Sequence, residues 1–133
     1  MGFGAKKLIL DTNALSAAAE GDGALLTLLT QTSQEVEIPV IVLGEYRFGI
    51  AQSRQREEYR LWLENFLSSC TVLDVNEETS RHYAVIALEL RKAGKPIPSN
   101  DLWIAALCRQ HHVPVVSRDR HFDTVFGIER LEW

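Results

Sequence analysis

The sequence has little of what marks a secreted or membrane-bound chain. Its 133 residues include 2 cysteines, Cys70 and Cys108, without a CxxC pair, which favours reduced structural thiols over a disulfide framework. No apolar run reaches the roughly 18 residues of a membrane helix, and residues 1–7 lack the long apolar region of a secretory signal. We therefore expect a cytoplasmic protein that does not cross a membrane.

Positive charge is also scarce, with 14 Lys and Arg against 18 Asp and Glu and a formal net charge of −4. This balance argues against a nonspecific nucleic-acid binder held by a basic surface. The absence of a P-loop, a GxSxG elbow and a dinucleotide glycine fingerprint disfavours nucleotide kinases, serine hydrolases and Rossmann dehydrogenases. The length suits one buried core, so we expect a single domain over residues 1–133.

What the chain does contain is a regular alternation of short apolar runs and helical patterns. The expected strands are 7–10, 35–38, 71–75 and 113–117, with 128–131 as a possible fifth. The expected helices are 14–20, 24–34, 39–51, 54–66, 77–93 and one that runs from a cap at Ser99 or Asn100 to about 111. This order predicts an α/β fold whose mostly parallel central sheet of four to five strands is covered by helices on both faces.

Four acids stand at the edges of apolar runs: Asp11, Glu45, Asp101 and Asp119. Burying unpaired carboxylates is costly, so four such positions suggest a shared cation. Asp11 and Asp119 directly follow predicted strands, and ligands of open α/β sheets bind outside the carboxyl ends of strands. Oxygen ligands without His or Cys suit a hard ion such as Mg²⁺ or Mn²⁺, which can promote hydrolysis of a phosphodiester.

Each acid also has an ordinary structural explanation when it is taken alone. Asp11 and Asp119 suit helix caps or turns, and Asp101 suits the first turn of a helix, where a carboxylate complements the helix dipole. Glu45 can pair with Arg47 or Arg91 on an exposed helix face. The functional hypothesis therefore depends on the four acids together.

The histidines receive no catalytic role from the sequence. Cys108, His111 and His112 form a zinc-like fragment without a further ligand at suitable spacing, so a helix end that carries imidazoles is favoured. His82 and His121 are lone residues, which we expect to be surface groups or satisfied polar groups.

Two further functions stay open at this point. A metal-dependent, structure-specific nuclease acting on DNA would use the same carboxylates, because these do not distinguish the sugar. A nonenzymatic interaction module would bind a partner protein through a stripe of apolar side chains on the helix 54–66, in particular Tyr59, Trp62 and Phe66.

Four motifs give the sequence a specific resemblance. They are Leu10-Asp11-Thr12-Asn13, Glu45 with Arg47 and Gly49-Ile50, Asn100-Asp101-Leu102-Trp103-Ile104-Ala105-Ala106, and Ser117-Arg118-Asp119-Arg120-His121-Phe122. In order and spacing they resemble the motifs of PIN domains, in particular the VapC-type toxin ribonucleases of bacterial and archaeal toxin–antitoxin pairs. The resemblance extends from about residue 7 to residue 131.

The resemblance implies a PIN-like three-layer α/β/α sandwich and an Mg²⁺- or Mn²⁺-dependent endoribonuclease that cleaves RNA. It further implies a homodimer and a cognate VapB-like antitoxin that blocks the site. By the same resemblance, the four acids would hold the metal and activate water, and Thr12, Asn13 and Ser117 would orient them.

Other residues near these motifs are candidates for lesser roles. Arg47, Arg118 and Arg120 adjoin the acids and are candidate contacts to RNA phosphates. Asp123 is a candidate outer ligand, although the family pattern does not require it.

Overall fold

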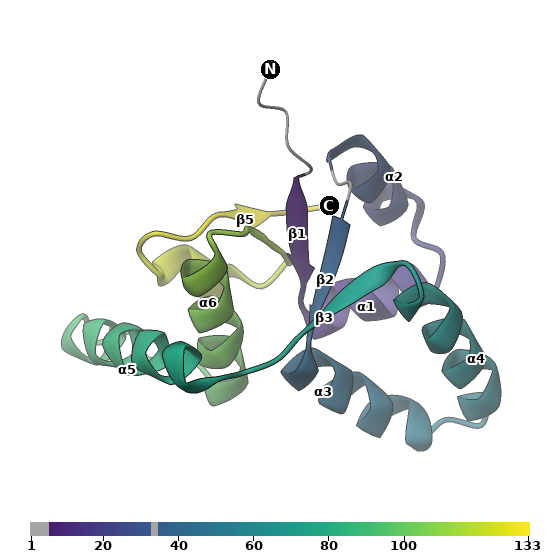
Figure 1. Ribbon diagram of the computed structural model, residues 1–133, viewed down its shortest axis with the longest axis horizontal. Helices are drawn as coiled ribbons and strands as arrows, with labels where there is room; N and C mark the ends of the chain where they lie inside the picture. The colour runs from purple at the N-terminus through teal and green to yellow at the C-terminus, as the bar shows by residue number, and fades with distance from the viewer. Residues whose placement is uncertain (1–5, 33–34) are drawn as a thin grey trace.

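The computed structural model describes residues 6–32 and 35–133, and the expected alternation of strands and helices is present (Figure 1). Positions 33 and 34, at the end of the expected helix 24–34, lie outside the described residues. The elements in order are β1 (Lys7–Leu10), α1 (Thr12–Ala19), α2 (Gly23–Thr32), β2 (Glu35–Pro39), α3 (Val40–Ala51), α4 (Arg56–Leu67), β3 (Cys70–Leu73), α5 (Glu77–Lys92), α6 (Ser99–His111), β4 (Val115–Val116), the 3-10 helix η1 (Arg120–Thr124) and β5 (Arg130–Leu131).

The five strands form one sheet in the order β3-β2-β1-β4-β5, and every neighbouring pair is parallel. The chain builds outwards from β1 to β3 and then returns through α5 and α6 to place β4 on the other side of β1. The strand order therefore reverses between β1 and β4. Such a reversal leaves a crevice at the carboxyl ends of the two strands, where ligands of open α/β sheets bind.

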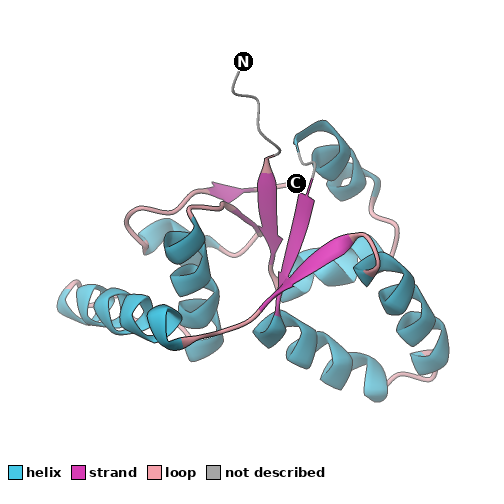
Figure 2. Cartoon of the chain, viewed as in Figure 1, coloured by secondary structure: helices cyan, strands magenta, loops and turns pink. Residues whose placement is uncertain are grey.

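Helices cover the sheet on two sides, which gives the three layers expected from the sequence. In Figure 1, α1, α2 and α4 lie to the right of β1 and β2, and α5 and α6 lie to the left; Figure 2 shows the same layers by type of structure. In the central strand β1, the consecutive residues Leu8, Ile9 and Leu10 are all buried, as expected of a strand covered on both faces. No helix in the described part of the chain is long and apolar enough to cross a membrane.

Several expected boundaries were wrong by a few residues, and one expected cap is different. The strand expected at 113–117 is reduced to Val115–Val116, and η1 was not expected at all. The helix α6 is preceded by Pro98, with no capping side chain from Ser99 or Asn100, because both residues already lie within the first turn. The Pro98 carbonyl accepts the first helical hydrogen bond, from the Leu102 amide at 3.0 Å.

Candidate active site

Asp11 lies at the carboxyl end of β1 and is only 5% exposed. Its Oδ1 accepts a hydrogen bond from the Ala14 amide at 2.8 Å, so it caps α1, as its sequence position predicts. Its Oδ2 accepts a hydrogen bond from the hydroxyl of Ser117, a residue 106 positions further along the chain. Asp11 is therefore both a helix cap and a member of a cluster built from distant segments.

Ser117 ties the ends of β1 and β4 together across the crevice. The residue is completely buried, and its Oγ accepts a hydrogen bond from the Asp119 amide at 2.8 Å while its hydroxyl donates to Asp11. One hydroxyl thus positions two of the predicted acids. The hydrogen bonds are compatible with the orienting role that the resemblance implies for Ser117, which stays a prediction.

Asp101 and Asp119 meet around a third side chain, His121. The Nδ1 atom of His121 lies 3.1 Å from Oδ2 of Asp101 and 3.1 Å from Oδ1 of Asp119. One ligand atom from each of the three lies within 4.8 Å of the others, a spacing that suits a single metal ion. Asp101 comes from the first turn of α6, whereas Asp119 caps η1.

His121 is the exposed polar residue that the sequence predicts, but it is not isolated, because its partners are two of the predicted acids. Its ring faces the two carboxylates because Asp119 caps η1, where its Oδ1 accepts the His121 amide at 2.9 Å. The available signal was its position two residues after Asp119. The spacing alone did not predict that a short helix would form here and direct the His121 ring towards Asp119, the residue that caps it.

Glu45 lies at the margin of this cluster. Its Oε1 accepts a hydrogen bond from the Thr12 hydroxyl at 2.7 Å, so Thr12 links α1 to α3. The charge of Glu45 is near enough to raise the pKa of Asp101. This contact is the partner of Glu45 in the structure, rather than the alternative ion pair with Arg47 or Arg91.

The electrostatics of the cluster favour a bound cation. Burial raises the pKa of the Asp11 carboxyl; the hydrogen bonds from Ser117 and Ala14 lower it, and the charges of Asp101 and Asp119 raise it again. Burial likewise raises the pKa of Asp101, with repulsion from Asp119 and Glu45 opposing the lowering effect of His121. Carboxylates that destabilise one another's charge fit a divalent ion, which takes oxygen ligands and relieves the repulsion.

Two residues near the acids are engaged elsewhere. Arg118 donates through Nε to the Trp133 carbonyl oxygen at 3.1 Å, and its guanidinium lies 4.5 Å from the centre of the Trp133 ring. Asp123 accepts two hydrogen bonds from Arg130, at 2.8 and 3.0 Å, which lower the pKa of Asp123. Neither side chain has a described contact with the acid cluster, so Asp123 is a poor candidate for an outer ligand.

Three of the predicted residues, Asn13, Arg47 and Arg120, are exposed. Asn13 makes no hydrogen bond to the acids within the described part of the chain, so its orienting role stays a prediction. Arg47 and Arg120 are exposed on α3 and η1, where they are accessible to a phosphate. Their contact with RNA also stays a prediction.

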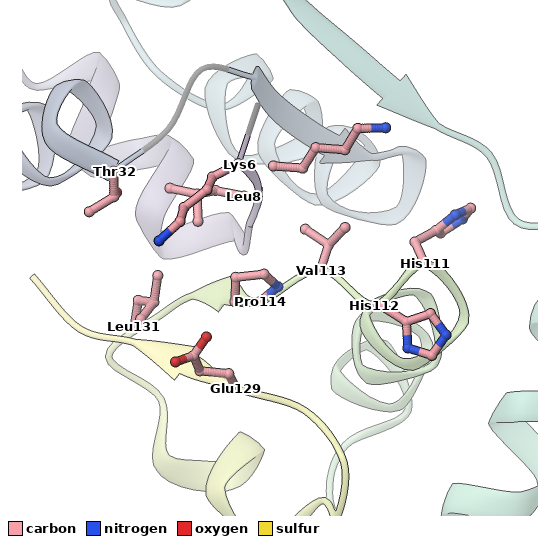
Figure 3. Close-up of a pocket in the computed structure, with 10 residues that line it drawn as sticks. Lys6, Leu8, Thr32, His111, His112, Val113, Pro114, Glu129 and Leu131 are labelled. Atoms are coloured by element: carbon pink, nitrogen blue, oxygen red, sulfur yellow. The ribbon is translucent and has the colours of Figure 1, made fainter. Parts of the chain in front are cut away.

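A cavity of about 570 Å³ lies away from the acids, at the amino-terminal ends of the strands (Figure 3). It is lined by Lys6, Lys7, Leu8, Thr32, His111, His112, Val113, Pro114, Glu129 and Leu131. None of the four acids lines it. This cavity is therefore separate from the acid cluster.

The alternative sites considered from the sequence do not assemble. Among the described residues, no cluster of three metal-ligating side chains includes Cys108, His111 or His112, and Cys108 is buried in the core as a free thiol. The apolar stripe on α4 is partly buried. Trp62 and Phe66 pack against the core, and Trp62 contacts Tyr46 of α3 with ring centres 6.3 Å apart.

Comparison with known proteins agrees with this geometry. The family model of the PIN domain matches residues 8–127. A relative named Ribonuclease VapC2, from Haemophilus influenzae, is 30% identical over 129 residues, covering 96% of this chain and 98% of its own. A tRNA(fMet)-specific endonuclease VapC from Shigella flexneri is 27% identical with the same coverage.

Solved structures show the same architecture. DNA-bound VapBC from Salmonella typhimurium contains a chain that superposes with a TM-score of 0.86 at 26% identity, covering 96% of this chain and 98% of that chain. VapBC2 from Rickettsia felis, bound to a DNA fragment from its promoter, gives a TM-score of 0.85 at 25% identity with the same coverage. The sheet order, the clustered acids and the match over residues 8–127 lead to one conclusion: this chain belongs to the PIN domain family.

Proposed function

We propose that this chain is a divalent-metal-dependent endoribonuclease and the toxin of a type II toxin–antitoxin pair. The observation that carries the proposal is the meeting of Asp11, Asp101 and Asp119, from three distant segments, at the switch point of a parallel sheet. The relatives named VapC ribonucleases support the choice of RNA as substrate. Because the proposed substrate is RNA, we place the protein in the cytoplasm.

In this function Asp11, Asp101 and Asp119 would hold the ion, which is Mg²⁺ or Mn²⁺. When bound, such an ion lowers the pKa of a coordinated water and stabilises negative charge on the phosphate under attack. Glu45, which accepts a hydrogen bond from Thr12, would complete the set of carboxylates that hold the ion, and we propose that it accepts a proton from the attacking water.

The chain's own hydrogen bonds keep these groups in place before substrate arrives. Ser117 fixes the relative position of Asp11 and Asp119, and the backbone of η1 fixes Asp119. Preorganised groups do not have to reorganise during the reaction, which lowers the barrier. Arg47, Arg118 and Arg120, all exposed and close in sequence to the acids, are the proposed contacts to the RNA backbone.

The direct test is cleavage by two isosteric variants. Asp11→Asn and Asp101→Asn each remove one negative charge with little change in shape, so both should abolish cleavage of RNA in Mg²⁺ or Mn²⁺ while circular dichroism stays unchanged. Asp123→Asn is the matched control, because Asp123 is held by Arg130 outside the cluster, and it should cleave like the parent.

Equal cleavage by the parent and both site variants would refute the mechanism. The same assay on single-stranded and structured DNA separates the ribonuclease from a nuclease that acts on DNA. Cleavage of DNA in preference to RNA would favour the latter.

We also propose that the toxin forms a homodimer and is inhibited by a VapB-like antitoxin. Support comes from the solved VapBC complexes that share this fold. Sedimentation of the chain, whose mass is 15.0 kDa, should give twice that mass. Coexpression with the protein encoded by an adjacent small reading frame should give a stable complex in which RNA cleavage is suppressed.

A further inference from the structure

His121 is the side chain in the acid cluster that the carboxylate pattern does not account for. Its backbone is held by local structure: the His121 amide donates to Asp119 at the start of η1, the Thr124 hydroxyl donates to the His121 carbonyl at 2.7 Å, and the next residue, Phe122, is buried. The imidazole is nevertheless half exposed, at 50% of its side-chain area. It is therefore a fixed group at the open side of the site.

The distances around Nδ1 are those of a coordination shell. In an octahedral site with ligands about 2.1 Å from the ion, neighbouring ligand atoms lie about 3.0 Å apart. Nδ1 lies 3.1 Å from a carboxylate oxygen of Asp101 and 3.1 Å from one of Asp119. One ligand atom from each of the three side chains lies within 4.8 Å of the other two, a span that one ion can bridge.

We infer that His121 is a nitrogen ligand of the metal and that it shifts the preference of the site from Mg²⁺ towards Mn²⁺. This inference rests on the proposed function, because it concerns the same ion. Mg²⁺ takes oxygen ligands and retains several waters, so it gains little from an imidazole. Mn²⁺ also binds mainly oxygen ligands, but it stands at the start of the transition series in which affinity for nitrogen ligands increases, so it gains more from an imidazole than Mg²⁺ does.

A hydrogen-bonding role for His121 would have a different consequence. If the imidazole served only as a positive charge between Asp101 and Asp119, it would occupy the place of the ion and compete with it. Removing the ring would then strengthen metal binding. The two roles thus predict changes of opposite sign.

The experiment uses the full chain and Mn²⁺ alone, without RNA. Pulsed electron paramagnetic resonance of the Mn²⁺-loaded parent should show coupling to ¹⁴N from the imidazole, and this measurement requires no variant. Titration of free Mn²⁺ gives its dissociation constant, and competition gives that of Mg²⁺. His121→Gln should lose the ¹⁴N coupling and bind Mn²⁺ at least about tenfold more weakly, while Mg²⁺ affinity falls by a smaller factor.

His82→Gln is the matched control. His82 also lies beside a carboxylate, with Nε2 3.9 Å from Glu78, but it is on α5 and outside the cluster. This variant should keep both the coupling and the affinities of the parent.

Mn²⁺ bound to the parent without ¹⁴N coupling would overturn the inference and leave the nuclease proposal intact. Tighter or unchanged Mn²⁺ binding by His121→Gln would overturn it as well, as would equal losses for the two ions. If the parent bound neither ion at millimolar concentration, the proposed function itself would fail, and the inference with it.

Discussion

At the scale of single residues, Asp11 shows how one side chain serves both the fold and the site. One carboxylate oxygen caps α1 and the other receives the Ser117 hydroxyl. The structural and the functional explanations of this position are therefore compatible. A local preference for Asp at a helix start places a carboxylate where β1 ends, and the tertiary structure supplies its distant partner.

Replacing Ser117 with alanine tests the hydroxyl that joins two acids. Ser117→Ala removes a donor to Asp11 and an acceptor for the Asp119 amide, so both acids lose their orientation. We expect RNA cleavage to fall about 10- to 100-fold and the free energy of unfolding without metal to fall by about 1 to 3 kcal/mol. Cleavage kinetics and urea denaturation measure the two effects.

Ser80→Ala is the control for this variant, because the Ser80 hydroxyl donates to the Glu77 carbonyl on the exposed face of α5. It should leave cleavage unchanged. Full activity of Ser117→Ala would show that the acids are positioned without the hydroxyl.

Glu37 is a buried acid outside the site, and its burial has a cost. It lies in β2, is 4% exposed, and its Oε1 has no hydrogen-bond partner in the part of the chain that the structure describes. Burial raises its pKa above 4.5, against the lowering effect of Lys7. The folded state therefore binds this proton more tightly than the unfolded state, so stability falls as the pH rises from 4.5 through the raised value, and the loss is complete above it.

Glu37→Gln should accordingly stabilise the protein at neutral pH. Urea denaturation at pH 7 should show a gain of about 1 kcal/mol, since the variant removes a buried charge. The gain should shrink below pH 4.5, where the parent carboxyl is protonated in both states. Glu58→Gln, at an exposed position of α4, should show no such gain. A gain of equal size at all pH values would contradict this account.

At the scale of elements, the packing of α5 against α6 determines where Asp101 lies. Thr79 on α5 is fully buried, and its hydroxyl contacts Gln110 on α6. Thr79 also completes a capping box with Asn76 at the start of α5. The first turn of α5 is thus tied to the last turn of the helix whose first turn carries Asp101.

Asn76→Ala should weaken this unit. The Asn76 side chain caps α5 by accepting a hydrogen bond from the Thr79 amide at 3.1 Å. Its removal should lower the free energy of unfolding by about 1 kcal/mol. Chemical denaturation measures the change. Cleavage at a temperature where the variant is folded should remain close to that of the parent, because Asn76 lies outside the acid cluster. If the variant were as stable as the parent, the cap would stabilise α5 no more than water bound to the Thr79 amide does.

At the scale of the whole molecule, the acid cluster places negative charges together at one end of the sheet. Burial, together with the charges of neighbouring acids, destabilises the ionised carboxylates of Asp11 and Asp101 when no cation is present and raises their pKa. In the metal-free protein, these carboxylates therefore lower the free energy of unfolding. A bound divalent ion would reverse this effect.

Metal should consequently raise the melting temperature. Mn²⁺ at 100 times its dissociation constant contributes about 2.7 kcal/mol, which corresponds to a rise on the order of 10 °C for a chain of this length. Chelation should return the melting temperature to its original value. Asp101→Asn should have a higher melting temperature than the metal-free parent, but Mn²⁺ should raise it little. If millimolar Mn²⁺ left the melting temperature of the parent unchanged, that result would contradict the metal site. Thermal scans should show one transition if residues 1–133 form one domain, as we propose.

The sequence by itself determined the alternation of elements, the parallel sheet and the positions of the four acids. These features follow from local rules, since apolar runs specify strands, periodic patterns specify helices, and parallel strands place their carboxyl ends at one edge. The acids Asp11 and Asp119 could therefore be identified as neighbours from their places after β1 and β4.

Only the tertiary structure decided which partner each side chain takes. It turned His121 towards Asp101 and Asp119, placed Arg118 on Trp133, and paired Asp123 with an arginine. The physical reason is that a hydrogen bond or a coordination shell needs atoms within about 3 Å, and such distances depend on how helices and loops dock. Sequence patterns specify which face a residue occupies, whereas the packing of the folded chain sets what that residue touches.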